Sequence, residues 1–145
     1  CDEPFVAVLP SSHPLARHGR VEIAQLAQER FILHREGQNT RKIVDRFLFR
    51  NGISPRVPIE LAETETIKRM VSQGLGVSIL PVSAFMQRRS GDGLKIFPMP
   101  AEDLKRSLSV VFPKQKPLGP PAIAMVELLQ KHFNHQNVMA ARSRG

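Results

Sequence analysis

Cysteine is nearly absent from this chain of 145 residues, since Cys1 is the only one. A disulfide within the chain is therefore excluded, and so is a metal site built on several cysteines. A reducing compartment, the cytoplasm, fits this composition. Tryptophan and tyrosine are also absent, and the 8 phenylalanines mostly fall in apolar patterns. We therefore expect no aromatic platform on which nucleic-acid bases could stack.

Long hydrophobic runs are missing as well. No stretch approaches the roughly 20 apolar residues that a membrane-spanning helix needs, so we expect no membrane contact. Residues 1–4 are acidic and lack the basic and then apolar layout of a secretory signal peptide. The chain also begins without methionine, which favours a fragment or a processed piece of a longer protein.

The formal net charge is +8, with 21 lysines and arginines against 13 aspartates and glutamates. Such an excess fits either a nucleic-acid surface or a solvated basic face. The basic residues are scattered from Arg17 to Arg144 in runs of two at most, whereas a nucleic-acid patch normally gathers its charge on one element. The solvated face is the preferred interpretation, and the positive charge would also suit an anionic ligand.

Hydrophobic periodicity predicts strands that alternate with helices. Short apolar or alternating runs predict strands at residues 5–9, 31–33, 57–61, 77–81, 94–97 and 108–112. Spacings of three and four residues predict helices at residues 21–28, 39–52, 63–74, 82–89 and 120–133. This order implies an α/β fold with a largely parallel sheet and right-handed crossovers. Residues 135–145 lack periodicity, and we expect a disordered tail there.

The sequence lacks the patterns of enzymes. No serine lies in a Gly-x-Ser-x-Gly elbow, and no histidine lies in a His-Glu-x-x-His metal motif. Glu60, Glu63 and Glu65 cluster at a predicted strand–helix junction, but the helix dipole accounts for Glu63 and Glu65 in a first helical turn. His34 is interpreted as a plain loop histidine. We therefore expect no enzyme activity, no metal and no cofactor.

The segment Gly74-Leu75-Gly76 has some likeness to a phosphate-binding loop. A third glycine at dinucleotide-binding spacing is missing, and the glycines precede a predicted strand rather than a helix. We therefore predict that the helix stops at Gly74 and that a tight turn leads into the strand.

Two predicted strand–helix junctions, at residues 34–40 and 60–66, carry backbone donors and short polar side chains. Ligands of open α/β sheets bind beyond the carboxyl ends of strands, and the N–H groups of a helix start favour anions. Arg35 and Arg41 flank the first junction. Ordinary helix capping uses the same groups, so binding and capping remain equally open at both junctions.

Three segments together resemble the effector-binding domain of LysR-type transcriptional regulators, over roughly residues 4–134. A helix that ends in Asn51-Gly52-Ile53-Ser54-Pro55 supports the resemblance, and the third segment is its most specific motif. The three segments are His13-Pro14-Leu15-Ala16, Ile67-Lys68-Arg69-Met70-Val71 and Gly74-Leu75-Gly76-Val77-Ser78-Ile79-Leu80-Pro81.

This resemblance implies a periplasmic-binding-protein-like α/β fold, in which two lobes joined by crossing strands enclose an effector. The chain would hold one complete lobe plus the C-terminal strand and helix of the other lobe. The implied parts are a crossing strand at residues 1–9, the second lobe at 10–105, the return strand and helix at 106–134, and a tail at 135–145. The front half of the first lobe would be missing, and so would the N-terminal winged helix-turn-helix through which such regulators bind DNA.

The resemblance also implies the function of an effector-sensing domain, which binds a small anionic co-inducer in an interlobe cleft without a covalent step. Two alternatives share the scaffold, namely a solute-binding protein of a transporter and a small-molecule enzyme. A strand edge and helix face without their partners would favour a dimer or higher homo-oligomer. The implied effector-binding candidates are Pro10, Ser11, Ser12, Arg35, Gln38, Asn39, Thr40, Glu63, Thr64 and Thr66.

Overall fold

The computed structural model describes residues 1–145 except residues 88–90, 100, 101, 103, 112–116 and 143–145, and it describes only the backbone of residues 133–142. Residues 2–106 form one compact unit, and Cys1 with residues 107–145 forms another. The strands are β1 (Asp2–Pro10), β2 (Arg30–His34), β3 (Arg56–Leu61), β4 (Ser78–Pro81), β5 (Leu94–Pro98) and β6 (Lys105–Ser107). The helices are α1 (Asn39–Arg50), α2 (Thr64–Ser72) and α3 (Pro120–Arg142), with 3-10 helices η1 (Pro14–Arg17), η2 (Ile23–Leu26) and η3 (Val82–Phe85).

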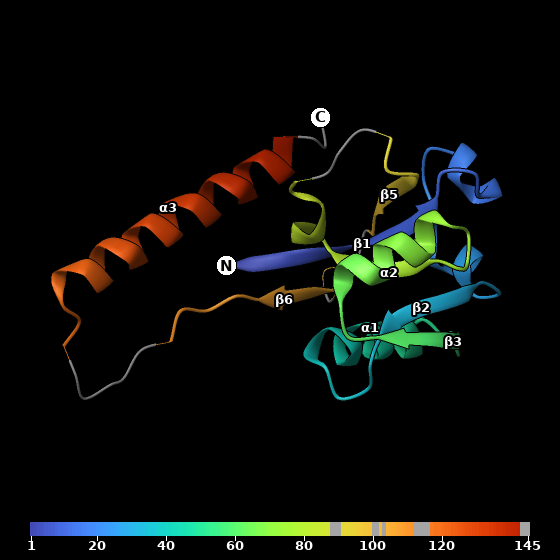
Figure 1. Ribbon diagram of the computed structural model, residues 1–145, viewed down its shortest axis with the longest axis horizontal. Helices are drawn as coiled ribbons and strands as arrows, with labels where there is room; N and C mark the ends of the chain where they lie inside the picture. Colours follow the sequence, from blue (N-terminus) through green and yellow to red (C-terminus); the bar gives the residue numbers. More distant parts are fainter. Residues whose placement is uncertain (88–90, 100–101, 103, 112–116, 143–145) are drawn as a thin grey trace. The chain divides into compact units, whose positions relative to one another are not determined.

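The main strands of the larger unit follow one another in the order β3, β2, β4, β1 and β5. Figure 1 labels β3, β2, β1 and β5 of this series. β2 pairs with β3 in parallel, and a parallel bridge joins Phe31 of β2 to Val77 just before β4. β1 lies antiparallel to both β4 and β5. The predicted largely parallel sheet therefore needs a correction at β1. Because β1 runs against its neighbours, its first residues lie at the sheet edge where β2, β3 and β4 end.

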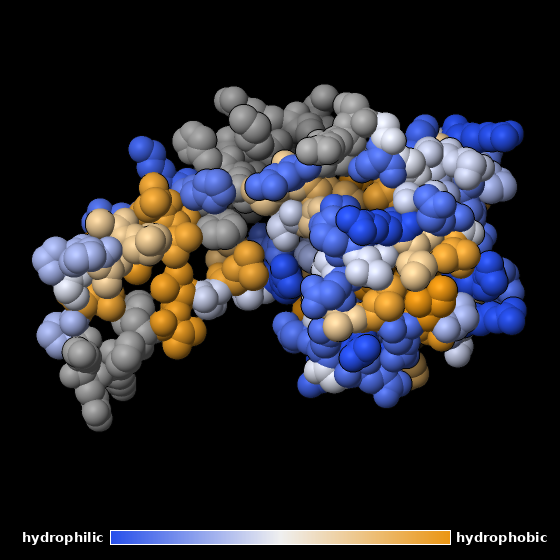
Figure 2. Space-filling view, viewed as in Figure 1, coloured by the Kyte–Doolittle hydropathy of each residue, from blue (hydrophilic) through white to orange (hydrophobic). Residues whose placement is uncertain are grey.

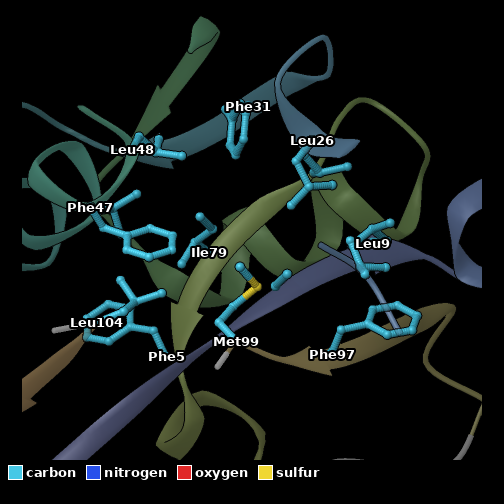
Figure 3. Packing of buried hydrophobic residues seen from close by; sticks show 14 of the residues in the cluster. Phe5, Leu9, Leu26, Phe31, Phe47, Leu48, Ile79, Phe97, Met99 and Leu104 are labelled. Atoms are coloured by element: carbon cyan, nitrogen blue, oxygen red, sulfur yellow. The ribbon is translucent and has the colours of Figure 1, made fainter. Parts of the chain in front are cut away.

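Side chains alternate between the two faces of this sheet, as the period of a strand requires. On β1, the side chains of Phe5, Ala7 and Leu9 belong to one buried cluster, and those of Val6 and Val8 belong to another. Side chains of α1 complete the first cluster, and side chains of α2 complete the second. Figure 3 shows the first cluster, in which phenylalanine and aliphatic side chains fill the space between the sheet and α1.

β3 is an edge strand of the described sheet, as Pro58 predicts because it has no N–H to donate. Arg30 pairs with Arg56 whereas Ile32 pairs with Ile59, so the register shifts next to this proline. The last residues of β3 pair with the last residues of β2, and the two predicted junctions begin there.

Gly74 and Gly76 act as the sequence predicts. Gly74 has a φ of +79°, and its N–H donates to the carbonyl oxygen of Val71 at 2.8 Å, which closes α2. Gly76 has a different role, because a Cβ there would fall on the carbonyl oxygen of Arg30. The predicted helix stop and tight turn are confirmed, and the close approach of β2 explains the second glycine.

The strand predicted at residues 108–112 is wrong. Strand pairing ends with β6 at Ser107, residues 108–111 have no regular structure, and Phe112 lies outside the described residues. The strand forms earlier in the chain, where Lys105 and Arg106 make ion pairs with Asp2 and Glu3. Apolar periodicity does not detect a strand that is stabilised by charged pairs across the ladder.

Three predicted helices also differ in length. The helices predicted at residues 21–28 and 82–89 are the four-residue 3-10 helices η2 and η3, although residues 88 and 89 lie outside the description. So few residues do not offset the cost of nucleating an α-helix. α3 continues to Arg142 through the predicted tail, where no glycine or proline interrupts residues 122–142.

The smaller unit contains Cys1, the segment after β6 and α3. The N-terminal amine of Cys1 donates to the carbonyl oxygen of Leu108 at 2.8 Å, and the N–H of Leu108 donates back to Cys1 at 2.8 Å. Apolar side chains on this unit are exposed, among them Val111, Met125 and Leu128. Figure 2 shows exposed hydrophobic surface in orange on the face of the molecule that it views. No helix in the described part of the chain is both long and apolar enough to cross a bilayer.

Candidate functional site

The carboxyl ends of β2 and β3 lie side by side at one edge of the sheet. His34, the last residue of β2, pairs with Leu61, the last residue of β3. The N–H of Arg35 donates to the carbonyl oxygen of Leu61 at 3.1 Å, so the chain leaves both strands together. After β2 the chain enters α1, which follows Gln38, and after β3 it enters α2, which follows Glu63. The two junctions predicted from the sequence therefore form a single corner of the larger unit.

His34 is a buried and neutral side chain at this corner. The residue is 6% exposed, and its Nε2 lies 3.1 Å from Oγ1 of Thr64, the first residue of α2. Burial lowers the pKa of His34, and the positive charge of Arg106 lowers it further against the opposite effect of Glu63. The neutral imidazole can therefore donate or accept one hydrogen bond with the threonine hydroxyl at neutral pH.

Gln38 leaves a buried acceptor without a partner. Its Nε2 donates to the carbonyl oxygen of Ala62 at 3.4 Å, which ties the start of α1 to the turn before α2. Its Oε1 is buried and has no hydrogen-bond partner in the described part of the chain. An unpaired buried acceptor costs about 1–3 kcal/mol, so a donor on a bound molecule would bind favourably there.

Arg106 brings a positive charge to the corner from β6. Its Nη1 donates to Oγ1 of Thr40, in the first turn of α1, at 3.4 Å. Its Nε forms a hydrogen-bonded ion pair with Oε2 of Glu3, near the start of β1. Oε1 of Glu3 accepts the backbone N–H of Ser83 at 2.9 Å. Burial alone would raise the pKa of Glu3, but the hydrogen bonds from Ser83 and Arg106 outweigh it and lower the pKa, so Glu3 is ionised at neutral pH.

Arg41 flanks the same corner but has partners within the protein. It is 7% exposed, and its Nη1 donates to the carbonyl oxygen of His34 at 2.9 Å and to Oε1 of Glu60 at 2.8 Å. Its Nε donates to both carboxylate oxygens of Asp45, at 2.8 and 3.0 Å. Arg41 therefore fixes the start of α1 on the end of β2 and is not free to hold an anion.

Several predicted binding residues meet here. His34 shares a hydrogen bond with Thr64, Arg106 donates one to Thr40, and Gln38 donates one to the backbone of Ala62. We call the following five side chains the corner site: His34, Gln38, Thr40, Thr64 and Arg106. Glu63, the N-cap residue of α2, is exposed beside them and acts on His34 through its charge. The N–H of Gln38 donates to the carbonyl oxygen of Arg35 at 3.3 Å. Within the described residues, no side-chain hydrogen bond joins the corner site to the remaining candidates of the two junctions: Arg35, Asn39 and Thr66.

The other predicted region lies elsewhere. Pro10 ends β1 and pairs with Leu94 at the start of β5, whereas Phe5 pairs with Pro81 at the end of β4. Pro10, Ser11 and Ser12 therefore stand at the opposite edge of the sheet from the corner site. The resemblance implied these three residues as effector-binding candidates, and the antiparallel direction of β1 places them away from the corner site.

Two residues of this network were not singled out from the sequence. Glu3 and Arg106 pair across 103 positions of the chain, and no local pattern signals such a contact. His34 was taken for a plain loop histidine, whereas the structure buries it against Thr64. Its position at the end of a predicted strand was the only signal available.

A surface groove of about 730 Å³ lies apart from the corner site, between α1 and the start of β3. Phe49 is 83% exposed there. In the described residues, no group of three or more histidine, cysteine, aspartate or glutamate side chains is placed to hold a metal ion. The groove is lined by Arg41, Asp45, Phe49, Gly52, Ile53, Ser54, Pro55 and Val57.

Comparison with known proteins identifies the family. Residues 1–134 match the family model described as the LysR substrate binding domain. The chain belongs to this family. This LysR domain is 31% identical over 132 residues to the transcriptional dual regulator GltC of Bacillus subtilis. It is 29% identical over 128 residues to the RuBisCO operon transcriptional regulator of Allochromatium vinosum. The alignments cover 91% and 88% of this chain but 44% and 42% of those relatives, so the chain spans less than half of their length.

A solved relative has the same fold. The regulatory domain of Synechocystis CcmR, in complex with 2-PG, aligns with a TM-score of 0.74 and 27% identity, over 88% of this chain and 62% of that chain. The resemblance drawn from the sequence is confirmed, and so is the periplasmic-binding-protein-like α/β fold. This LysR domain therefore presents its corner site at the carboxyl ends of parallel strands, where open α/β sheets bind ligands.

Proposed function

We propose that this LysR domain is the effector-sensing part of a bacterial transcriptional regulator, and that a small anionic molecule binds at the corner site. The observation that carries the proposal is the buried, unpaired Oε1 of Gln38 in the same group of side chains as the guanidinium of Arg106. An apolar corner would need no such groups. The named relatives, which are transcriptional regulators, support the choice of class.

The starts of two helices add further donors to the corner site. The N–H of Lys42 donates to the carbonyl oxygen of Gln38, and the N–H of Ile67 donates to that of Glu63. The N–H groups that precede these residues have no acceptor within their helices. Together with the positive dipole ends of α1 and α2, they favour a carboxylate or a phosphate over an uncharged group.

The proposed mechanism is a population shift without a covalent step. β1 and the segment that starts with β6 would be the crossing strands, with residues 10–105 as the second lobe, residues 106–134 as the return strand and helix, and residues 135–145 as a tail. An effector that binds one arrangement of the lobes more tightly increases its population in proportion to that difference in affinity. Recognition by hydrogen bonds and charge suffices for this role, so we propose that the domain is not an enzyme.

The proposed partners of the intact regulator follow from its class. We infer a cytoplasmic homo-oligomer that binds DNA through a winged helix-turn-helix, which is separate from the residues of the corner site. The greater length of the named relatives leaves room for such a domain. The same relatives lend no support to the alternatives of a transporter's solute-binding protein or a small-molecule enzyme.

Thermal melting of the intact regulator with a panel of small carboxylates and phosphorylated metabolites tests the proposal. A ligand present at one hundred times its Kd stabilises the folded state by about 2.7 kcal/mol, and the melting temperature rises accordingly. Gln38→Ala should reduce the rise, because it removes a group of the corner site. Gln28→Ala is the matched control at an exposed position, and its response should equal that of the unchanged protein.

Two outcomes would contradict the proposal. One is that no compound of the panel raises the melting temperature or alters DNA binding by the regulator. The other is that a compound stabilises the protein but the Gln38 and Gln28 variants respond equally, since the binding site would then lie away from the corner.

A further inference from the structure

Arg106 differs from Arg41 in how firmly its donors are held and in how far solvent reaches its side chain. The hydrogen bonds of Arg41 within the described residues are 2.8 to 3.0 Å long and go to two carboxylates and one backbone carbonyl, and its side chain is 8% exposed. Arg106 uses Nε for Glu3 and Nη1 for a long bond of 3.4 Å to Thr40. Its Nη2 has no hydrogen-bond partner among the described residues, and its side chain is 26% exposed. Arg106 therefore has donor capacity left at a position that solvent reaches.

Glu3 is buried behind this arginine. Its side chain is 5% exposed, and both carboxylate oxygens have partners, Ser83 N–H on one and Arg106 on the other. The other charged groups near Arg106 have little effect on an incoming anion. Glu63 is exposed, so water and salt screen its effect on an incoming anion, and the Asp2–Lys105 pair is exposed and neutral as a whole. Glu3 is therefore the main negative charge that an anion near Arg106 would meet.

We propose that Arg106 is the residue that selects anionic effectors at the corner site, and that Glu3 is its internal counter-ion, which competes with the acidic group of the effector. This inference rests on the proposed function, because it concerns the chemistry of the same site. A carboxylate or phosphate takes the free Nη2 and shares Nη1 with the hydroxyl of Thr40. Guanidinium recognises both kinds of anion through two parallel hydrogen bonds.

A purely structural ion pair makes a different prediction. If Arg106 and Glu3 only joined β6 to β1, neutralising either residue would loosen the corner and weaken every ligand alike. If Glu3 competes with the effector as a counter-ion, neutralising Glu3 and neutralising Arg106 have opposite effects on anion binding. Neutral Glu3 frees Arg106 and strengthens anion binding, whereas neutral Arg106 removes the attraction and weakens it.

The test measures the Kd of inorganic phosphate, glycolate and uncharged glycolamide for the intact regulator by calorimetric titration. Arg106→Gln should weaken the binding of the anions by about tenfold or more, the loss expected for one charge-assisted hydrogen bond. Glu3→Gln should strengthen it several-fold, and it keeps an acceptor for Ser83. Glycolamide should bind Arg106→Gln and the unchanged protein equally. Arg20→Gln is the matched control, because Arg20 forms an exposed pair with Glu22 and should bind as the unchanged protein does.

Arg106→Gln leaves the buried carboxylate of Glu3 without its counter-ion, which destabilises the folded variant. A second variant avoids this problem. The double variant Glu3→Gln with Arg106→Gln has two neutral side chains that can still hydrogen-bond, and it should fold and show no preference for glycolate over glycolamide. Binding of phosphate alone or of glycolate alone supports the inference and identifies the acidic group. Equal weakening by both single variants overturns it. Failure of both anions to bind the unchanged protein overturns it as well, whereas the proposed function would still be decided by the melting panel.

Discussion

The guanidinium of Arg41 donates a hydrogen bond of 2.9 Å to the carbonyl oxygen of His34, the last residue of β2. Arg41 lies in the first turn of α1, so this bond fastens the start of the helix to the end of the strand. The same guanidinium reaches Glu60 on β3 and Asp45 one turn further along α1. One buried side chain thus joins α1, β2 and β3 beside the corner site, without taking part in the site itself.

Replacing Arg41 should destabilise the fold and disturb the corner site indirectly. In Arg41→Ala the carbonyl oxygen of His34 loses its charged donor, and we expect a loss of about 2 kcal/mol in the free energy of unfolding. Arg46→Ala, on the exposed side of the same helix, should change it by less than about 0.5 kcal/mol. Urea unfolding of both variants measures the difference. Equal stability of the two variants would show that the Arg41 network contributes nothing net.

Local patterns in the sequence account for most of the fold. The apolar run of β1, the apolar stripe of α1 and the turn at Gly74 each depend on residues within a few positions of one another, and the structure bears out all three. The two polar junctions were also located correctly, because a helix that follows a strand exposes its first N–H groups wherever the sheet leads.

Long-range pairing accounts for what the sequence did not show. Arg106 meets Glu3 only because β6 returns beside β1, and the predicted strand at residues 108–112 lay a few positions too far along the chain. Strand direction explains the other difference. Pro10, Ser11 and Ser12 end a strand just as His34 does, but β1 runs against its neighbours. Sequence patterns indicate that a strand exists and do not indicate its direction in the sheet.

Stability should fall in mildly acidic solution because of His34. Its pKa is lower in the folded protein than the ordinary value of 6.5, so the unfolded state binds the proton more readily. The contribution of neutral His34 to the free energy of unfolding is complete above the ordinary pKa. It is lost as the pH falls below 6.5 towards the pKa of His34 in the folded state.

Unfolding in urea between about pH 5 and pH 8 tests this dependence, since the carboxylates contribute little there. His34→Gln should flatten the curve because glutamine does not titrate. His18→Gln, at an exposed position, should keep the slope of the unchanged protein. A His34→Gln curve as steep as that of the unchanged protein would assign the slope to other groups.

Gly76→Ala should destabilise the fold although alanine is the smallest possible addition. The new Cβ would fall on the carbonyl oxygen of Arg30, a backbone atom that cannot move without disturbing β2. Overpacking of this kind costs about 1–3 kcal/mol. In Gly119→Ala the nearest atom, on Pro121, is 3.8 Å from the added Cβ, so stability should hardly change. Thermal melting compares the two, and a stable Gly76→Ala protein would mean that β2 and the turn can separate at little cost.

Phe47 and Phe49 give a matched pair on a single helix, since Phe47 is 4% exposed and Phe49 is 83% exposed. Phe47 packs in the cluster between the sheet and α1, so Phe47→Ala should lower the free energy of unfolding by about 3–5 kcal/mol. Phe49→Ala removes a side chain that already faces solvent, and the change should stay within about 0.5 kcal/mol. Urea unfolding at one low protein concentration measures both variants and keeps association out of the comparison. A large loss for Phe49→Ala under those conditions would contradict the position of α1 on the sheet, because the helix would then have to turn its other face to the core.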